Sequence, residues 1–450
     1  MGSETRETGT RPGAETIAPR RRLSPGPGLG AREVAAHQLA RIYEATIQIV
    51  AEHGYKALKV RDVVSLAEVS TRAFYDHFGS KDDCFLQAYQ RIVRSATHRM
   101  IAAQTGERAW RERPRRIFEE FARQLVQEPA RARLVLLDAY AAGEASLSQA
   151  WRTERVFEGL VAESLARAPD GVTVPPLVVE GIVAGIASVS RDRLFAGKTG
   201  SLRDEGSELV DWALCHVGPA TAELQRLDQQ YPWRDTTLEP SLGDNDGSWP
   251  STGDRALILK AVANLTVAGG YGHLTAPRVR STASVSRRKF EAYFDGVEDC
   301  YLAALDQHAG EALAKAARAQ AAASSWAGSV YRTIAALCDH VATDAFLATV
   351  CLTDGFPREP DGLRSRERLI NSISELLSES VPRDALPSPS TVEASTGAVW
   401  LLFHHHIVRD WAMRRQISAT LTYMALTPIL GGGAATEAIE GEQGAAGARR

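Results

Sequence analysis

The strongest constraint on the fold is an internal repeat, because residues 42–88 recur without a gap as residues 258–304. The two copies are related by a single offset of 216 positions. At this offset the identical residues are Ile42, Ala45, Gly54, Tyr55, Leu58, Val63, Ser65, Ala67, Val69, Ser70, Arg72, Phe74, Phe78, Asp83, Cys84, Leu86 and Ala88. A repeat of this length, followed in each case by a long helical pattern, predicts two copies of one domain. Since most soluble oligomers are two-fold symmetric dimers, we interpret the chain as such a pair fused into one polypeptide.

Composition narrows the broad class of the protein. The 450 residues are 44% hydrophobic and 24% charged, which is typical of a globular chain with two or three domains. The net charge of −3 does not by itself indicate nucleic acid as a partner. The five cysteines are scattered without a CxxC pair, which argues against a disulfide framework or a zinc site and favours a reducing compartment.

Several features expected of other classes are missing from the sequence. We find neither a secretory signal nor a run of about 18 apolar residues, and therefore expect a cytoplasmic protein without a membrane partner. Walker A, Rossmann, G-x-S-x-G and H-E-x-x-H patterns are also missing, so we expect no enzyme, no cofactor and no catalytic residues.

The chain divides into seven parts, nearly all of them helical where they are structured. Apolar residues recur at three- and four-residue spacing between the linkers, and no alternating pattern indicates a strand, so the predicted class is all-α. The predicted parts are a disordered arm (1–33), a first helix-turn-helix domain (34–90), a first helical domain (91–227), a linker (228–253), a second, divergent helix-turn-helix domain (254–306), a second helical domain (307–430) and a disordered tail (431–450).

The first copy contains the pattern of a helix-turn-helix. Gly54 ends a helix of residues 40–52, a short helix covers residues 60–67, and Ser70 is the expected N-cap of a third helix over residues 71–77. Phe74 and Phe78 share the inner face of that third helix, and Ser80 is expected to cap a longer fourth helix. Two short helices joined steeply in this way place the second one in the DNA major groove.

These residues also carry a family resemblance. The run VSTRAFYDHFGSKDD resembles the DNA-binding domain of TetR-type transcriptional regulators, strongly over residues 40–90 and weakly to about residue 220. Residues 129–143 and 179–214 look like the ligand-domain helices of that family. The resemblance implies two TetR-like lobes, each with a helical ligand-binding and pairing domain. Glu68 stands where the family usually has glycine, so it is expected either to strain the turn or to cost a few tenths of a kcal/mol.

Geometry on the first copy indicates which side chains reach DNA. Side chains on the outer face of the third helix and at the starts of the second and fourth helices point away from the Phe74/Phe78 face. Arg72 is the expected base reader, because arginine can bind guanine through two hydrogen bonds, while the others position the domain on phosphates. The predicted DNA-binding residues of this copy are Lys59, Arg61, Thr71, Arg72, Tyr75, His77 and Lys81.

The second copy keeps the core but changes the surface. Tyr75 is matched by Glu291, His77 by Tyr293 and Lys81 by Val297. Two interpretations remain open: this helix-turn-helix binds DNA through other contacts, or it is a structural relic that completes the pair. A run of basic residues favours the first. The predicted DNA-binding residues are Thr275, a possible N-cap, with Arg278, Arg287, Arg288, Lys289 and Tyr293; Arg280 belongs to the same run.

The remaining helices suggest a pairing interface and a ligand pocket. By resemblance, residues 179–189 with 202–214, and residues 392–403 with 417–426, form a four-helix interface, in which Gly181 and Gly185 permit close approach. Simple local packing is the alternative. The candidate ligand-binding residues are Tyr140, Trp151, Trp400, Phe403 and His404. We expect no metal site, because the three consecutive histidines 404–406 point in different directions on a helix.

The leading hypothesis is a ligand-responsive transcriptional regulator, a repressor, that binds a double-stranded DNA operator as a single-chain pseudo-dimer and is released by a small-molecule effector. We expect a monomeric pseudo-dimer, with further homodimerisation left open. The alternative is a helical module that sequesters a small molecule or a protein and has degenerate DNA contacts.

Overall fold

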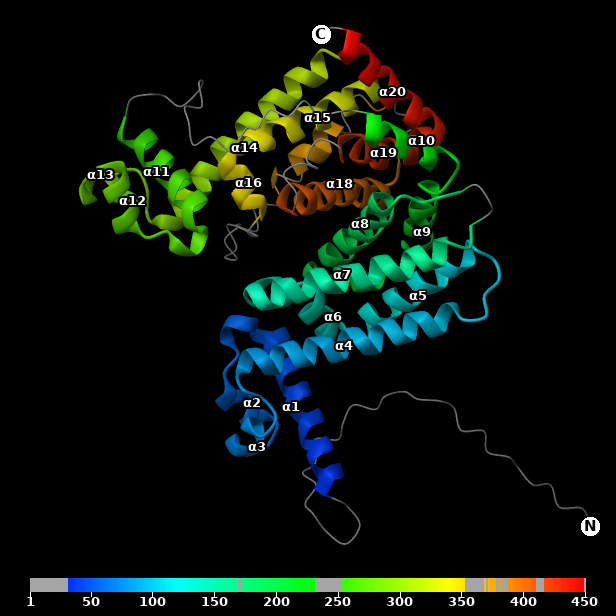
Figure 1. The fold of residues 1–450 in the computed structure, drawn as a ribbon. Helices are drawn as coiled ribbons and strands as arrows, with labels where there is room; N and C mark the ends of the chain where they lie inside the picture. The colour runs from blue at the N-terminus through cyan, green and yellow to red at the C-terminus, as the bar shows by residue number, and fades with distance from the viewer. Residues whose placement is uncertain are drawn as a thin grey trace, which may run out of the picture. The chain divides into compact units, whose positions relative to one another are not determined.

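A computed structural model describes residues 31–168, 172–230, 253–352, 368–369, 371–377, 381, 387–409 and 417–448. Within these ranges all regular elements are helices, so the all-α class is confirmed (Figure 1). The predicted arm over residues 1–30 and the centre of the linker, residues 231–252, lie outside the described residues. The chain divides into two compact units, which are described separately.

The first unit comprises residues 31–95 and 128–150. It contains α1 (Ala31–His53), η1 (Tyr55–Ala57), α2 (Val60–Leu66), α3 (Thr71–Tyr75), the start of α4 (Lys81–Gln104), α6 (Pro129–Leu136), η2 (Asp138–Ala141) and the first turns of α7 (Glu144–Leu165). Helix α1 packs on α2 and α6. Its core includes Ile42, Phe74, Phe78 and Phe85, each at most 1% exposed.

Helix α1 begins before residue 34, where the disordered arm was expected to end. Its first turn carries Glu33, which favours the positive end of the helix dipole, and Ala35 and Ala36 are strong helix formers. The boundary predicted for the disordered arm is therefore three residues too late.

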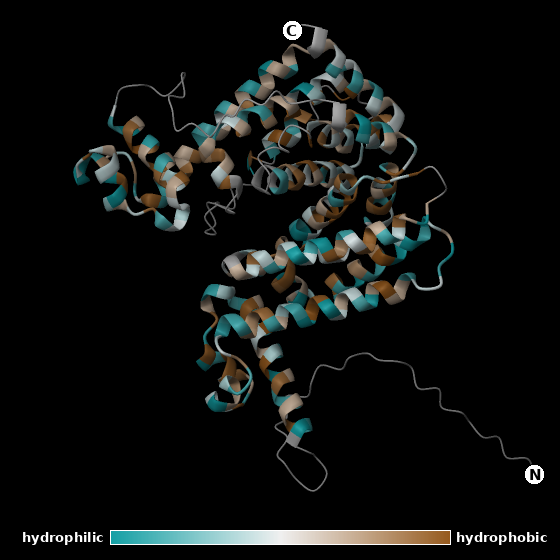
Figure 2. Cartoon of the chain, viewed as in Figure 1, coloured by the Kyte–Doolittle hydropathy of each residue, from teal (hydrophilic) through white to brown (hydrophobic). Residues whose placement is uncertain are grey.

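The second unit holds the rest of the chain. In chain order its helices are the end of α4, α5 (Glu112–Gln127), most of α7, α8 (Pro176–Phe195), η3 (Thr199–Arg203), α9 (Gly206–Cys215), α10 (Ala220–Gln230), α11 (Asp254–Gly269), η4 (Tyr271–His273), α12 (Ala276–Ala283), α13 (Arg287–Glu291), α14 (Val297–Ala321), α15 (Trp326–Thr343), α16 (Ala345–Leu352), α18 (Pro389–Arg409), α19 (Ile417–Leu430) and α20 (Gly432–Ala448). Most of these helices carry both apolar and polar residues (Figure 2) and bury their apolar side, whereas α19 is buried around nearly its whole circumference.

Within the second unit, α11 to α14 repeat the element order of α1 to α4, including a single 3₁₀ turn between the first two helices. Helices α11, α12 and α13 form a small bundle, and α11 also packs on α14 and α16. The buried residues of this bundle include Val279, Phe290 and Phe294.

The C-terminal tail is a correction to the sequence-based expectation. Residues 431–450 were predicted to be a disordered tail, but residues 432–448 form α20, which packs on α10, α15 and α19. Ala435 and Ile439 lie one turn apart on α20 and are fully buried. The many alanines favour helix, and this apolar pair supplies the tertiary contact that a composition argument overlooked.

Candidate nucleic-acid interface

The turn of the first helix-turn-helix is held by local hydrogen bonds. The Ser70 hydroxyl accepts a hydrogen bond from the Ala73 amide at 3.0 Å, which confirms the predicted N-cap of α3. Likewise, the Ser80 hydroxyl accepts from the Asp83 amide at 3.1 Å at the start of α4. On the inner face, the Phe74 and Phe78 rings lie 5.2 Å apart between centroids. The serine caps and the packed phenylalanine rings therefore fix the orientation of α3, and with it the direction in which its outer face points.

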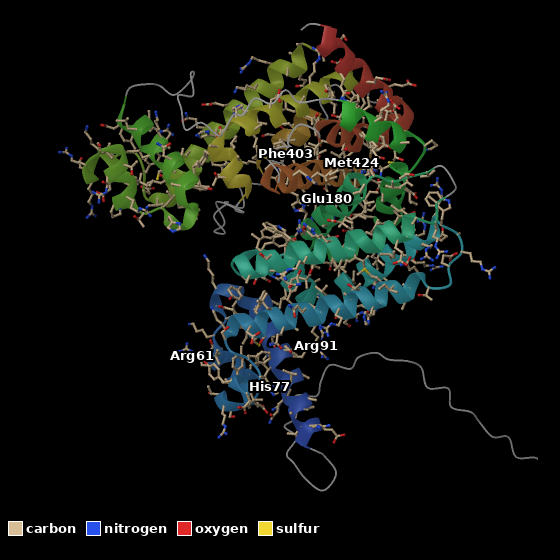
Figure 3. All side chains as sticks on the ribbon, in the orientation of Figure 1. Arg61, His77, Arg91, Glu180, Phe403 and Met424 are labelled. Atoms are coloured by element: carbon tan, nitrogen blue, oxygen red, sulfur yellow. The ribbon has the colours of Figure 1, made fainter. Side chains whose placement is uncertain are left out.

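The predicted DNA-binding residues of this copy lie at its surface. Tyr75 is 56% exposed, and the half-buried residues of the set are His77 and Lys81. Figure 3 shows Arg61 and His77 in this domain. The remaining exposed members are Lys59, Arg61, Thr71 and Arg72. The structure thus leaves these side chains available at one helix-turn-helix, as a DNA interface requires.

Lys81 and Arg61 also make contacts inside the domain. The Lys81 ammonium donates to the Leu58 carbonyl oxygen at 3.2 Å and lies 4.9 Å from the centre of the Tyr55 ring. The Arg61 guanidinium pairs with Asp62 at 3.2 Å. Because an ammonium has three N–H donors, Lys81 keeps donors for a phosphate while it is held near the start of α4.

The second helix-turn-helix repeats the serine cap of the recognition helix and the aromatic pair on its inner face. The Ser286 hydroxyl accepts from the Lys289 amide at 3.3 Å, and the Phe290 and Phe294 rings lie 6.0 Å apart. Thr275 is the N-cap of α12, since its hydroxyl accepts from the Arg278 amide at 3.4 Å. The N-cap predicted at Thr275 is therefore confirmed.

The predicted DNA-binding residues of the second copy are all exposed, although several are bonded within the protein. Tyr293 is 48% exposed. Arg278 donates to the His273 carbonyl oxygen at 3.1 Å. The other exposed members are Thr275, Arg287, Arg288 and Lys289, whereas Arg280 is half-buried.

Both turns contain a non-glycine residue in the left-handed region. Glu68 has φ 50° and Ser284, at the same register, has φ 55°. Each follows the end of a helix, and the next amide closes the turn: Val69 donates to the Val64 carbonyl, and its counterpart Val285 donates similarly. An L-residue pays about 1–2 kcal/mol in this conformation, which glycine avoids. The expected strain at Glu68 is thus present in the backbone.

Arg41 supports the strained turn in the first copy only. Its guanidinium donates to the Glu68 carbonyl oxygen at 3.0 Å and lies 3.7 Å from the Glu68 carboxylate. Arg41 is 7% exposed, whereas Leu257 at the same register in the second copy is 48% exposed. The two turns therefore share a backbone conformation but differ in what holds it.

The segments expected to pair are brought together inside the second unit. Helix α8 packs along α18, and both α9 and α19 contact this pair. A Cβ atom on Gly185 would lie 2.6 Å from the Ala394 carbonyl oxygen, and one on Gly397 would lie 2.3 Å from Ser188 Cβ. Only glycine leaves enough space at these two positions, so the backbones of α8 and α18 approach closely there.

Hydrogen bonds join α9 to the C-terminal helices. The Trp212 indole donates to the Ser395 hydroxyl at 2.9 Å. The Tyr423 hydroxyl donates to the His216 carbonyl oxygen at 3.1 Å, and a His216 ring nitrogen lies 3.2 Å from the Met424 carbonyl oxygen. Complete burial lowers the pKa of His216 to about 4, so its ring is neutral at pH 7. These contacts link residues about 200 positions apart.

Sequence reasoning missed one partly buried polar cluster across α8 and α18. The two Glu180 carboxylate oxygens contact the His405 ring at 3.1 Å and the His406 ring at 2.8 Å, and His405 also lies 3.3 Å from Glu154. Burial alone would raise the pKa of Glu180, but the two histidine hydrogen bonds lower it to about 2. The available signal was Glu180, the one charged residue in the otherwise uncharged stretch of residues 176–190. Figure 3 labels Glu180 on α8.

A second buried polar cluster was also missed. Asp344 accepts a hydrogen bond from His308 at 2.6 Å and from the Leu347 amide at 2.9 Å, and His340 lies 3.6 Å away. Burial would raise the pKa of Asp344, but the bonds from His308 and His340 hold it below its usual range. All three polar side chains are at most 5% exposed.

One pocket has an entirely apolar lining. It has about 560 Å³ of empty space, its mouth included. Trp400 and Phe403 line it, as the interpretation of these residues as ligand-binding requires. The other lining residues are Ala309, Ala312, Ile334, Leu337, Val341, Leu347, Leu369, Ile373, Val399 and Leu421.

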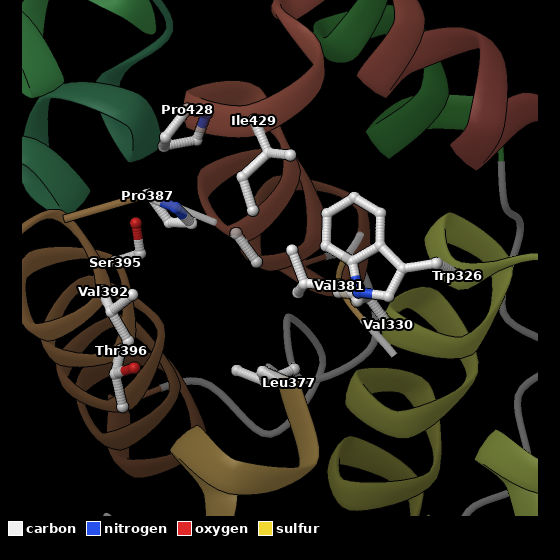
Figure 4. Close-up of a pocket in the computed structure, with 11 residues that line it drawn as sticks. Trp326, Val330, Leu377, Val381, Pro387, Val392, Ser395, Thr396, Pro428 and Ile429 are labelled. Atoms are coloured by element: carbon white, nitrogen blue, oxygen red, sulfur yellow. The ribbon is translucent and has the colours of Figure 1, made fainter. Parts of the chain in front are cut away.

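A second pocket lies between α15, α18 and α19 (Figure 4), with about 470 Å³ of empty space. Trp326 and Leu377 form one side of it, and Ser395 and Thr396 supply hydroxyl groups on the other. Neither pocket is lined by Tyr140 or Trp151, so the structure does not group these two with Trp400 and Phe403. The side chain of His404 lies outside the described residues.

Comparison with known proteins agrees with this geometry in the first domain. Residues 42–88 match the family described as bacterial regulatory proteins, tetR family. The structure of the fatty acid degradation regulator FadR from Bacillus halodurans is similar to part of the chain, at 16% identity and a TM-score of 0.35, covering 38% of this chain and 96% of FadR. No curated protein matches the chain.

The helix-turn-helix geometry and the match to residues 42–88 support the class of DNA-binding transcriptional regulators. More particularly, residues 42–88 are similar to the DNA-binding domain of TetR-type regulators. Among the described residues, no helix is long and apolar enough to cross a membrane, and no group of acidic, histidine and cysteine side chains is arranged to hold a metal ion.

Proposed function

We propose that this chain is a transcriptional repressor that binds one DNA operator as a single-chain pseudo-dimer and is released by a small molecule. The observation that carries the proposal is the second helix-turn-helix. It repeats the element order of the first and its left-handed turn residue, Ser284 for Glu68. The second copy therefore keeps the turn geometry that presents a recognition helix.

The packing of α8 and α9 with α18 and α19 supports the pseudo-dimer. In a two-fold interface each partner presents the same surface to the other. Gly185 on α8 meets α18 and Gly397 on α18 meets α8, which is the reciprocal pattern expected. The two halves are proposed to pair through these four helices. A covalent linker raises the effective concentration of one half for the other to roughly the millimolar range, so pairing needs no dimerisation equilibrium.

The apolar pocket supports the ligand response. Ala309 and Ala312 on α14 line it, and the same helix starts at Val297, directly after the second helix-turn-helix. Near its start, the ring of Tyr301 lies 4.7 Å from the Tyr271 ring of that domain. A molecule that fills the pocket would displace α14 and with it the second recognition helix. Ligand and DNA would then weaken each other's binding by the same factor.

The decisive experiment selects DNA sequences with the purified full-length chain and footprints the result. We expect one chain, with its mass measured by light scattering, to protect two unlike half-sites whose centres lie about 34–36 Å apart or a multiple of this. Protection of a perfect palindrome by two chains would overturn the pseudo-dimer. If the folded chain shifts no DNA in a gel-shift assay at low salt, the result would instead favour the alternative hypothesis, a module that sequesters a small molecule or a protein.

A further inference from the structure

The second recognition helix carries three consecutive cations, but two of them are bonded to carboxylates of the protein. Arg287 Nε donates to Glu291 Oε1 at 2.6 Å, one turn along α13. Lys289 Nζ contacts both oxygens of Asp254, at 3.0 and 2.9 Å. Asp254 is the first residue of α11, so this second pair ties α13 to α11.

The third cation, Arg288, differs from its neighbours. It is exposed and forms no ion pair or side-chain hydrogen bond with any described residue. Its counterpart in the first copy is Arg72, which is equally exposed and without such a bond among the described residues. Each arginine lies two residues after the serine N-cap of its helix, so both side chains leave the helix in the same direction.

The bonded residues of the second helix have no charged counterparts in the first. Thr71, Ala73 and Tyr75 stand where Arg287, Lys289 and Glu291 stand in the second copy, and Gln38 stands where Asp254 does. By sequence, the second recognition helix is strongly basic and the first is nearly neutral. This contrast disappears once the ion pairs of Arg287 and Lys289 are taken into account. Each recognition helix presents one unpaired arginine at the same register.

We propose that the second helix-turn-helix reads its half-site through Arg288, at the register of Arg72, and that Glu291 and Asp254 weaken its hold on DNA. This inference rests on the proposed function. The guanidinium would bind O6 and N7 of a guanine, the contact that arginine makes most often in the major groove. The two half-sites would therefore share one guanine and differ beside it.

The carboxylates act in two ways. They hold the charges of Arg287 and Lys289, which would otherwise be free to neutralise phosphates and release counterions. They also bring negative charge towards the DNA backbone. The Arg287–Glu291 pair is solvent-exposed on both sides, so the bond itself is weak and the repulsion contributes much of the effect.

The test measures binding of the full-length chain to its selected operator as a function of salt. Glu291→Gln and Asp254→Asn keep the side-chain size and remove the charge. Each is expected to raise affinity by about two- to fivefold at low salt and to steepen the salt slope by about 1, because one more cation reaches a phosphate. Asp306→Asn is the matched control, because Asp306 lies on α14, pairs with Arg368 and undergoes the same charge change away from the recognition helix. It should leave the salt slope unchanged.

Arginine-to-alanine variants identify which arginine contacts the guanine base. Arg288→Ala should lower affinity by about 5- to 150-fold on the operator and lose its effect when the shared guanine of the second half-site is replaced. Arg72→Ala should behave in the same way towards the first half-site. If Glu291→Gln weakens binding or broadens base preference, Glu291 orients Arg287 as the reader and the proposal is wrong. Unchanged affinity in both carboxylate variants would equally overturn it.

Footprinting of the wild-type chain alone shows whether the proposed function itself is wrong. If the wild-type chain protects only one half-site, the second helix-turn-helix does not bind DNA, whatever Glu291 does. If it protects two half-sites and Arg288→Ala leaves the second protected with unchanged affinity, the pseudo-dimer stands and only the assignment of Arg288 falls.

Discussion

The close approach of α8 and α18 predicts that a single methyl group at Gly185 will destabilise the protein. In Gly185→Ala the new Cβ would lie 2.6 Å from the Ala394 carbonyl oxygen and 2.3 Å from the end of the Trp212 ring. Unstrained carbon contacts lie at about 3.5–4.0 Å. The Trp212 ring must therefore move by roughly 1 Å or more, which breaks its 2.9 Å hydrogen bond to Ser395.

Two destabilising effects and one stabilising effect determine the expected change in the free energy of unfolding. Overpacking costs about 1–3 kcal/mol, and loss of the Trp212 hydrogen bond adds about 0.5–1.5 kcal/mol. Replacement of a helical glycine by alanine returns about 1 kcal/mol. The free energy of unfolding should therefore fall by about 0.5–3.5 kcal/mol, which thermal unfolding followed by circular dichroism would record as a lower Tm.

Gly181→Ala is the matched control, one turn away on the same helix. Its Cβ would meet only the ends of the flexible Leu402 and Met424 side chains, at 3.0 Å, and these can move aside. We expect its Tm to equal or slightly exceed that of the wild type. Combining Gly185→Ala with Gly397→Ala should cost less than the sum, because one separation of α8 and α18 relieves both clashes. Equal stability of the Gly185 and Gly181 variants would refute the reasoning.

Three further predictions concern single sites. Ser284→Gly should stabilise the second helix-turn-helix by about 0.5–1 kcal/mol in chemical unfolding, and Glu68→Gly by less, because it also removes the contact with Arg41. Asp138→Asn should stabilise the chain by about 2–3 kcal/mol above pH 6 and by little at pH 4. Burial raises the pKa of Asp138 to about 6, so wild-type stability falls as pH rises from about 4 to 6, and a flat difference between the two proteins over that window would contradict this. Lys81→Ala should weaken binding to all DNA sequences, lower the salt slope by about 1 and reduce thermal stability through the lost Leu58 contact; an unchanged slope would show that Lys81 contacts no phosphate.

Local features of the fold could be predicted because they depend on nearby residues. The caps at Ser70 and Thr275 follow from residue type and from the apolar spacing that comes after them. The α3 helix ends two residues earlier than expected, at Tyr75, because the His77 amide bonds to Phe74 in a tighter turn. Sequence patterns cannot locate the end of a helix to within about one or two residues.

Contacts between distant segments could not be predicted in the same way. The Arg287–Glu291 pair has the i,i+4 spacing that favours an ion pair, so the sequence contains its signal. The Lys289–Asp254 pair joins residues 35 positions apart and requires the packing of α11 on α13. The Glu180 cluster likewise depends on how α8 crosses α18, which no local pattern specifies.

A single-chain pair changes what a substitution in a recognition helix can do. In a homodimer every substitution occurs twice, so a glutamate at the register of Tyr75 would face phosphate in both arms and weaken both. In the proposed pseudo-dimer Glu291 affects one arm, while the first keeps Tyr75 and Lys81. The covalent link holds the weaker arm near the DNA once the stronger one is bound, because the second binding step is then intramolecular. Divergence of the second helix is therefore tolerated as long as the core residues Phe290 and Phe294 and the cap at Ser286 preserve its geometry. These are the features that the two copies share.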